Sequence, residues 1–593
     1  MRASERTASG DIMEAQLLPE DSIDSFTTES QTESNMKKRL LAEPSSSFNV
    51  VIAASVACIG PFIFGYSLGF TSPVLTAMRV LKDDAPFGDT SLTELSHGEV
   101  SIDSDEASLF SSIVNIGAMI GSILGGLLCD KFGRKVTISA SAFPFVLAWG
   151  WTAIAQSYQE LIAARFVIGL MVGIISMSVP LYIGEVAPTH LRGSLGAANQ
   201  FALTIGILVS YVVGILAEEH QVTLITCLPD ANDDDSMVWL HGKSYDLTCK
   251  DIVSDWKCEA KGDDFYCQGS LPMWRLLAWV AAGVSALLLV LMPFMPESPT
   301  FLVKQGRVED ARKSMIFLRG DSAMHADYEL RLLEKENRSD AKINVVDYET
   351  MSKSGEESER MTSINSEGSH NNQSVVSMLM APEMRRPLAM GIGTMLFQQF
   401  SGINAVIFYS GQILETAGLS NANVGGAIVM SFQVLFTGIS IILMDKAGRT
   451  VLMAVSSGGM CLSGLLLAFF FLNPNSNPSS LALIALVGYI ATFALGMGPV
   501  PWLFMGEIFP AHVRAPACSL ATLVNWSSGF IVTYFFATVS TALTPSGTFV
   551  VFAGVCFGGV CFAVMVMPET KGKTLEMIAK EFKIASGRHS VNE

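Results

Sequence analysis

The stretch Asp130–Lys135 (DKFGRK) decides the fold, because a closely similar charged turn, Asp445–Arg449 (DKAGR), recurs late in the chain. Each turn directly follows an apolar segment long enough to cross a bilayer, so each is expected at the edge of a membrane. Basic residues of short loops mark the cytoplasmic side, and one such turn alone would be only a topology anchor. A second copy in the same setting indicates a repeated unit.

Two further motifs recur in the same order. One apolar segment of the first half ends in Gly184-Glu185, and one of the second half ends in Gly506-Glu507. Pro296-Glu297-Ser298 likewise returns as Pro568-Glu569-Thr570. Three paired motifs in matching order predict two parallel six-helix halves with a midplane site between them, which is an architecture of transporters.

The composition is that of a membrane protein. The chain has 593 residues, of which 50% are hydrophobic and 16% are charged, whereas soluble proteins average about 25% charged residues. Apolar segments long enough to span a bilayer are predicted at 48–70, 107–129, 136–155, 161–183, 195–217, 273–295, 388–414, 424–444, 450–472, 481–505, 515–543 and 549–567. The predicted fold class is therefore an all-α membrane protein with twelve transmembrane helices.

The loop charges predict the orientation of this integral multi-pass protein. Lysines and arginines gather in the short loops of one side, which predicts that both termini are cytoplasmic. The opposite loops are acidic, with Asp83 and Asp84 after the first predicted helix and Asp233–Asp235 after the fifth. The net charge of -17 argues against a nucleic-acid partner, and no cleavable signal peptide is apparent.

The chain is expected to divide into five parts. They are a disordered cytoplasmic N-terminal tail (1–47), the N-terminal six-helix half (48–299), a cytoplasmic linker with short helices and a disordered Ser/Glu-rich segment (300–386), the C-terminal six-helix half (387–569) and a cytoplasmic C-terminal tail (570–593).

Four cysteines lie in the outer loop 218–272, namely Cys227, Cys249, Cys258 and Cys267. Four cysteines in an oxidising compartment indicate two disulfides, with three possible pairings. A zinc site is the alternative, although the spacing lacks a CxxC pair.

Gln398, Gln399 and Asn404 place three amides inside one apolar segment. Unpaired polar groups are costly at membrane depth, so these amides should face the bundle interior or a water-filled cavity. On one ideal helix they would lie roughly 100–140° apart, but a break at Gly402 would turn all three towards one cavity. They would then suit a polyhydroxylated solute; the alternative is that they only bond neighbouring helices.

Together these motifs resemble those of the sugar porter family of the major facilitator superfamily, which includes the facilitative glucose transporters. Besides the charged turns, the resemblance rests on PESP at 296–299, the segment 398–410, GPVPW at 498–502 and PETKG at 568–572. It covers roughly residues 48–580. In pattern it is closest to the intracellular-type animal hexose transporters and the plant vacuolar monosaccharide carriers. It implies the major facilitator fold and alternating-access transport of a monosaccharide, most simply glucose or another hexose.

The resemblance also implies a set of sugar-binding side chains. They are Gln200, Gln398, Gln399, Asn404, Gln433, Trp502, Asn525 and Trp526. Amides both donate and accept hydrogen bonds, as sugar hydroxyls do, and an indole plane suits the apolar C–H face of a pyranose. Gln433 stands where many members have an asparagine, and Ala494 where some have a glutamate, so the exact sugar stays open.

Proton-coupled members of the family carry an aspartate in the first helix and a partner arginine in the fourth. Here the aspartate position holds Ser67, whereas Arg165 is retained. Serine does not titrate in the physiological range, so we expect facilitated diffusion without proton coupling. A proton-coupled symporter is the alternative mechanism, and inositol or another polyol, or trehalose, are the alternative substrates.

Ion-pair clusters are expected at the cytoplasmic mouth in the outward-open state. Their members come from both halves: Asp130, Arg134, Glu185, Arg192, Asp445, Arg449, Glu507 and Arg514. Half-exposed ion pairs contribute about 0–1 kcal/mol each, but several together can bias a two-state equilibrium. Topology anchoring would explain the basic members but not the acidic ones.

No enzyme is expected, because the apolar segments hold no nucleophile–base pair or metal-ligand cluster, and neither a cofactor nor a metal is expected. The expected partners are a small-molecule sugar and the lipid bilayer. A non-transporting sugar sensor is the competing class of function. The sequence does not choose between the plasma membrane and an internal endolysosomal or vacuolar membrane, and it does not give the oligomeric state.

Overall fold

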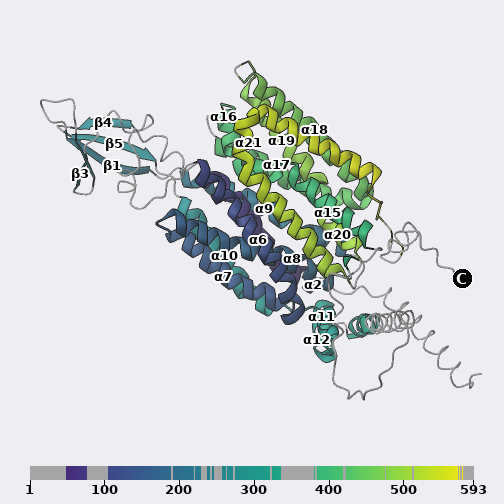
Figure 1. The fold of residues 1–593 in the computed structure, drawn as a ribbon. Coiled ribbons are helices and arrows are strands. Elements are labelled where there is room, and N and C mark those ends of the chain that lie inside the picture. Colours follow the sequence, from purple (N-terminus) through teal and green to yellow (C-terminus); the bar gives the residue numbers. More distant parts are fainter. Residues whose placement is uncertain are drawn as a thin grey trace, which may run out of the picture.

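The computed structural model describes most of the chain outside the tails. Described are residues 48–75, 104–188, 191–218, 274–320, 323–334, 379–380, 384–418, 422–474, 476–509, 513–571, 573 and 577, together with the backbone of five strands between 221 and 270. The expected N-terminal tail and the Ser/Glu-rich part of the linker lie outside these residues. Figure 1 shows two bundles of helices packed side by side, one from each half of the sequence.

The first bundle begins with α2 (Phe48–Ala57) and α3 (Ile59–Gly69), which together form the first span. It continues with α6 (Ser104–Phe132), α7 (Arg134–Ile154), α8 (Tyr158–Val186), α9 (Arg192–Glu218), α10 (Trp274–Leu291) and the short η1 (Met292–Phe294). The second bundle comprises α15 (Arg385–Phe400), α16 (Ile403–Thr416), α17 (Ala422–Ala447), α18 (Arg449–Leu472), α19 (Ser479–Leu495), α20 (Val500–Ile508) and α21 (Arg514–Met565).

Two features reconcile these helices with twelve spans. Within the described residues, ten segments are long and apolar enough to cross a membrane alone. The pair α15 and α16 adds another span, broken at Gly402 with a φ of 86°. Helix α21 contains two spans, because Thr544 (φ 65°, ψ 159°) interrupts it just before Pro545. The predicted all-α fold with twelve transmembrane helices is confirmed.

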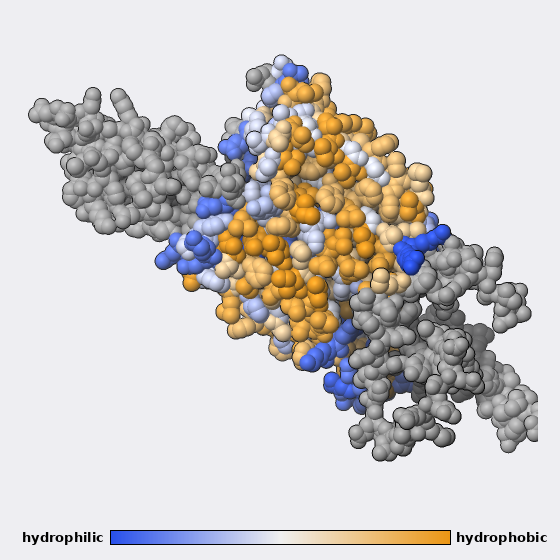
Figure 2. All heavy atoms as spheres, in the orientation of Figure 1, coloured by the Kyte–Doolittle hydropathy of each residue, from blue (hydrophilic) through white to orange (hydrophobic). Residues whose placement is uncertain are grey.

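Small residues let the helices of the first bundle approach closely. A Cβ atom added at Gly121 of α6 would lie 2.0 Å from the backbone oxygen of Leu170 on α8. One added at Gly173 of α8 would lie 2.3 Å from the oxygen of Ala118 on α6. Without a hydrophobic driving force between helices in lipid, such close backbone packing is what holds them together. Large apolar side chains cover the flanks instead, and the hydrophilic residues gather at the ends (Figure 2).

The outer loop forms an antiparallel sheet that the sequence analysis does not predict. Its strands are β1 (Gln221–Leu228), β2 (Met237–Leu240), β3 (Lys243–Tyr245), β4 (Lys257–Lys261) and β5 (Asp264–Ser270), in the order β3-β2-β1-β5-β4. The β-branched run of residues 221–226 and the aromatic residues of β5 carry the strand signal. The register sets Cys258 opposite Cys267.

Short helices after η1 attach to the first bundle. These are α11 (Pro299–Lys304), α12 (Val308–Leu318) and the helix 323–334, at the end of the bundle opposite the sheet (Figure 1). Asn49 of α2 donates to the Phe317 oxygen at 2.8 Å, and Arg319 donates to the Val186 oxygen at 3.2 Å. The positive charge of Arg319 is balanced by Glu329 at 2.5 Å. These contacts fix the linker helices to the first half.

Candidate functional site

A cavity with about 730 Å³ of empty space, open solvent at its mouth included, lies between the two bundles. Pockets for small molecules commonly enclose about 300–1,000 Å³. The fold brings into its wall every side chain that the sequence analysis assigns to sugar binding, namely Gln200, Gln398, Gln399, Asn404, Gln433, Trp502, Asn525 and Trp526. They come from α9 in the first half and from α15, α16, α17, α20 and α21 in the second.

The break at Gly402 explains how three amides of one segment share this cavity. Gln398 and Gln399 lie in the last turn of α15, and Asn404 lies in the first turn of α16. The left-handed backbone of Gly402 redirects the chain between them, and the Nδ2 atom of Asn404 donates to Oε1 of Gln399 at 2.8 Å. A side chain is excluded at Gly402, because a Cβ atom would lie 2.5 Å from the Phe552 ring. The predicted break is therefore present.

The amides continue as a hydrogen-bonded chain across the second half. Gln399 Nε2 donates to Oδ1 of Asn525 at 3.0 Å, and Asn525 Nδ2 donates to Oε1 of Gln398 at 2.8 Å. Gln398 Nε2 then donates to the backbone oxygens of Met497 and Gly498, both at 2.9 Å. Those carbonyls lie where α19 ends before α20 begins. The same amides thus line the cavity and join neighbouring helices.

Two indoles and two phenyl rings, those of Phe64 and Phe493, add apolar surface to the cavity. Trp526 is 1% exposed and packs on Phe64 with ring centroids 5.5 Å apart. Its Nε1 atom has no hydrogen-bond partner among the described residues. Trp502 lies on α20, directly after Pro501, and is half-buried. Flat apolar faces beside amides are the composition expected of a carbohydrate site.

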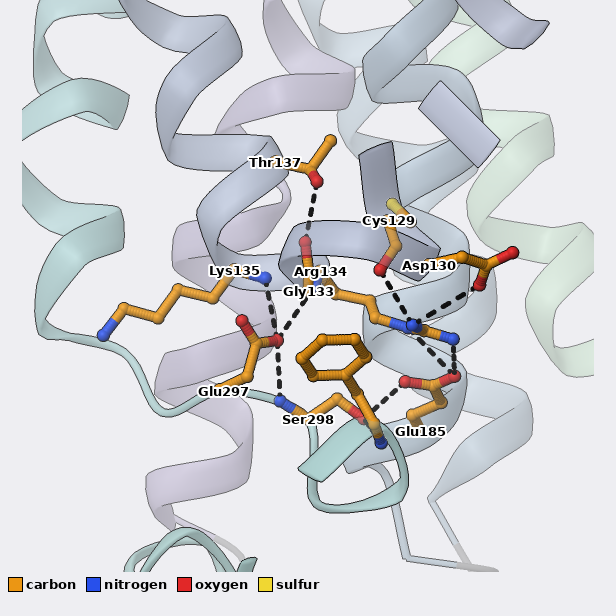
Figure 3. A network of polar contacts seen from close by, with 10 residues as sticks. Cys129, Asp130, Gly133, Arg134, Lys135, Thr137, Glu185, Glu297 and Ser298 are labelled. Atoms are coloured by element: carbon orange, nitrogen blue, oxygen red, sulfur yellow. Dashed lines mark hydrogen bonds and ion pairs between the residues drawn. The ribbon is translucent and has the colours of Figure 1, made fainter. Parts of the chain in front are cut away.

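At the end of the first bundle that carries the linker helices, Arg134 is the centre of a charged cluster (Figure 3). Its NH2 atom lies 2.9 Å from Glu185 Oε1, and its NH1 atom lies 3.7 Å from Asp130 Oδ1 and donates to the Cys129 oxygen at 3.0 Å. Arg134 is only 4% exposed. The three acceptors satisfy a guanidinium that the protein removes from water.

Glu297 fixes the turn that places Arg134. Its Oε1 atom accepts the backbone N–H groups of Arg134, Lys135 and Ser298 at 2.9–3.0 Å (Figure 3). Gly133 has a φ of 99°, and a Cβ atom there would lie 2.4 Å from Glu297 Oε2. The hydroxyl of Ser298 also donates to Glu185. The sequence analysis singles out Glu297 only as part of a repeated motif, not as a member of the cluster.

The second bundle repeats this cluster. Arg449 NH2 lies 2.7 Å from Glu507 Oε1, and Arg449 NH1 donates to the Met444 oxygen at 3.1 Å. Glu569 accepts the backbone N–H groups of Arg449, Thr450 and Lys571. Burial opposes ionisation of Glu569, but these donors hold the pKa of its carboxyl below the usual 4.5. Thr570 donates to Glu507 at 2.6 Å.

The gate residues whose side chains the structure describes lie in two clusters, one in each half. The ion pairs of Arg134 and of Arg449 each join residues of the same half. Arg514, at the start of α21, donates to the Phe509 oxygen at 3.2 Å. The side chains of Arg192 and Asp445 lie outside the described residues.

Towards the C-terminal end of α9, neutral hydrogen bonds join the two halves. Tyr211 of α9 bonds to the Ser410 hydroxyl at 2.5 Å and donates to the Ile407 oxygen at 2.7 Å, both on α16. The Gly411 N–H group donates to Ser72 Oγ at 3.1 Å. The sequence analysis misses these residues, because single hydroxyls in membrane helices usually bond their own backbone.

Arg165 is fully buried between aromatic rings. It donates to the Ser67 backbone oxygen at 3.1 Å and to Thr71 Oγ1 at 2.6 Å. The Phe110 and Phe70 ring centroids lie 4.7 and 5.5 Å from its guanidinium carbon. Within the described part of the chain it forms no ion pair, so its charge is met by neutral acceptors and π faces.

Comparison with known protein families gives one family model, "Sugar (and other) transporter", that matches residues 53–223 and 266–582. The unmatched segment between them falls in the outer loop and contains β2, β3 and β4. The sheet is therefore largely an insertion relative to the family.

Several curated proteins are similar over nearly the whole chain. "Solute carrier family 2, facilitated glucose transporter member 8" of Bos taurus is 30% identical, over 90% of this chain and 94% of that protein. "Sugar transporter ERD6-like 6" of Arabidopsis thaliana is 32% identical, over 91% of both. "Facilitated trehalose transporter Tret1" of Drosophila grimshawi is 32% identical, and the chain spans about half of its length (47%).

Solved structures share the fold. The proton:xylose symporter XylE bound to 6-bromo-6-deoxy-D-glucose superposes with a TM-score of 0.66, at 22% identity, over 90% of this chain and 99% of that one. The inward-open conformation of the xylose transporter XylE from E. coli gives a TM-score of 0.61. At this identity the likeness supports the fold alone.

Proposed function

The chain belongs to the sugar transporter family of the major facilitator superfamily, and we propose that it carries a hexose, glucose being the first candidate, by facilitated diffusion. The cavity between the halves is the observation that supports this most strongly. Seven amide side chains and two indoles line it. Groups that both donate and accept suit several hydroxyls at once, and such a site penalises an analogue that lacks one of them.

The glucose-transporter and trehalose-transporter relatives are each similar over 90% of this chain. A disaccharide such as trehalose is therefore an alternative to the proposed monosaccharide. Inositol and other polyols present the same hydroxyl chemistry and are the second candidates. Gln433, which lines the cavity, is the position at which we expect the choice among them to be made.

Alternating access is the proposed mechanism. The halves 48–299 and 387–569 would rock about the cavity, each kept rigid at its cytoplasmic end by the Arg134–Glu185 or the Arg449–Glu507 pair. The bonds of Tyr211 to α16 would break when the cavity opens outwards. The lysines and arginines of the short loops lie on the same side as both termini, which supports an orientation with both termini in the cytoplasm.

Transport without proton coupling is supported by the surroundings of Arg165. The first span offers Arg165 the Thr71 hydroxyl and the Ser67 backbone oxygen, neither of which is a carboxylate. The Ser67 hydroxyl itself donates to the Ile63 oxygen at 2.7 Å. Arg165 itself bonds only neutral oxygens in the described residues. A proton carrier is therefore missing at the position where the coupled members of the family have one.

Uptake by vesicles that contain the purified protein tests the proposal. Radiolabelled D-glucose should enter, unlabelled hexoses should compete, and myo-inositol and trehalose should compete weakly. Equal rates with and without an imposed pH gradient are expected. Accumulation above the outside concentration that collapses with a protonophore would contradict the uncoupled mechanism, and uptake of inositol or trehalose alone would contradict the hexose assignment.

A further inference from the structure

The cavity wall formed by α9 and α17 differs from the wall that carries the amide chain. Asn199 and Gln433 line the cavity from these two helices. The Oδ1 atom of Asn199 and the Oε1 atom of Gln433 are buried, and no described residue donates a hydrogen bond to either. In contrast, the amide oxygens of Gln398, Gln399 and Asn525 all accept hydrogen bonds.

A buried amide oxygen without a donor is uncommon and costly, and each case needs a physical reason. An oxygen whose hydrogen bond is not made has lost its water without gaining a partner, and this desolvation costs free energy. Exchanging one hydrogen-bond partner for another changes the free energy little. A ligand hydroxyl therefore gains more on the α9–α17 wall than on the amide chain, whose oxygens already have donors. Asn199 immediately precedes Gln200, so two adjacent amides of α9 line the cavity.

The two helices of this wall belong to different halves and are in contact. A Cβ atom at Gly426 of α17 would lie 2.6 Å from the Tyr211 ring of α9, and one at Gly438 would lie 3.6 Å from Phe201. A ligand that bonds both Asn199 and Gln433 would consequently join the halves. Such a ligand stabilises the conformations in which the two oxygens lie within its reach, and so it biases the conformational equilibrium.

We propose that Asn199 is a further substrate-binding residue, and that Asn199 and Gln433 select a sugar by accepting hydrogen bonds from its hydroxyls. This inference deepens the proposed function and rests on it. The sequence analysis does not single out Asn199. The signal that it carries is the Asn-Gln pair within an apolar helix, which parallels the Gln-Gln pair at the end of α15.

The test measures how well D-glucose and each of its monodeoxy analogues inhibit labelled D-glucose uptake in reconstituted vesicles. The wild type should reject one analogue by about tenfold or more, because that analogue leaves Asn199 unpaired. Asn199→Leu should weaken inhibition by D-glucose about tenfold and leave inhibition by that analogue unchanged, so that the selectivity is lost. Gln433→Leu should remove selectivity at a different hydroxyl.

Thr204→Val is the matched control on α9, because the Thr204 hydroxyl bonds the Phe201 oxygen and does not line the cavity. It should keep the wild-type inhibition pattern. Asn199→Ala provides a second variant, and thermal melting in detergent verifies that each variant is folded. A wild-type pattern in folded Asn199→Leu and Asn199→Ala, or an equal loss for every analogue, would overturn the inference. If no hexose inhibits uptake by the wild-type protein, the proposed function itself is refuted.

Discussion

Arg134 and Arg449 make equivalent contacts in the two halves of the protein. Each binds a glutamate at the end of a transmembrane segment, Glu185 at 2.9 Å and Glu507 at 2.7 Å. Each also donates to a backbone oxygen five residues earlier in the chain. Glu297 and Glu569 accept the backbone N–H groups at the start of α7 and α18 in the same way. The duplication that the charged turns indicate thus extends to individual hydrogen bonds.

Glu185→Ala should destabilise the protein and expose its cytoplasmic side. Arg134 is 4% exposed, and without Glu185 its remaining carboxylate partner is the exposed Asp130 at 3.7 Å. The loss should therefore be a large part of the ~3–5 kcal/mol that removing one partner of a buried pair costs. We expect a lower melting temperature in detergent and increased labelling of cytoplasmic-side cysteine probes. Arg307→Ala, which breaks an exposed pair with Asp310, should change neither. Unaltered melting and labelling of Glu185→Ala would show that the cluster does not hold the first half together.

Gly402→Ala should lower sugar affinity more than it lowers stability. Alanine is strained at a φ of 86°, and its Cβ atom would meet the Phe552 ring at 2.5 Å. The shift moves Asn404 away from Gln399, so the amide chain loses its first member. Gly554→Ala on α21, where a Cβ atom would meet nothing within 4 Å, is the control. D-Glucose inhibition constants that are equal for both variants would contradict this role of Gly402.

The sequence predicts the twelve spans from hydropathy, which is local to the chain. Polar residues within an apolar segment mark the wall of a cavity, and Gln398, Gln399 and Asn404 carry this mark. The other cavity residues, Asn525 among them, are implied by the resemblance to the sugar porter family. The bonds that order them into a chain depend on where the helices cross, which no local pattern encodes.

Other features lie beyond sequence reasoning for identifiable reasons. The bond between Tyr211 and Ser410 joins residues of opposite halves, and neither residue stands out from the hydroxyls around it. The oxygen of Asn199 that lacks a donor becomes visible only once its neighbours are placed, and the sequence itself offers no more than the adjacent Asn199-Gln200 pair. The separation of the charged residues into two clusters likewise follows from pairing distances, not from the repeated motifs.

Ser67→Asp should make transport depend on pH. The Arg165 guanidinium already bonds the Ser67 backbone oxygen at 3.1 Å, so a carboxylate at this position would lie beside a buried positive charge. An ion pair formed there would hold the first and fourth spans together until the carboxylate is protonated. We expect uptake of the variant to fall at neutral pH and to rise on acidification. Ser67→Asn, which cannot titrate, should show no such dependence, and a flat pH profile of Ser67→Asp would refute the prediction.

Glu569 should contribute stability that is lost in acid. Its pKa is held below 4.5 by three backbone donors. A carboxyl with a lowered folded-state pKa stabilises the protein above its unfolded-state pKa and loses that contribution as the pH falls through the folded-state value. The melting temperature should therefore fall below about pH 4.5, and Glu569→Gln should show a smaller fall. Asp310→Asn, at an exposed residue, should behave like the wild type.

Tyr211→Phe should favour the outward-open conformation. The hydroxyl is the only atom removed, and it bonds Ser410 at 2.5 Å and Ile407 at 2.7 Å across the two halves. The Ile407 oxygen keeps the Ser410 hydroxyl, at 3.5 Å, as a weak donor. Losing a buried hydrogen bond costs about 0.5–1.5 kcal/mol. That is enough to change a two-state ratio roughly threefold to tenfold. Labelling of an outer-vestibule cysteine should rise accordingly. Tyr534→Phe, at a half-exposed tyrosine on α21, is the control. Equal labelling of Tyr211→Phe and the wild type would show that these bonds do not close the outer side.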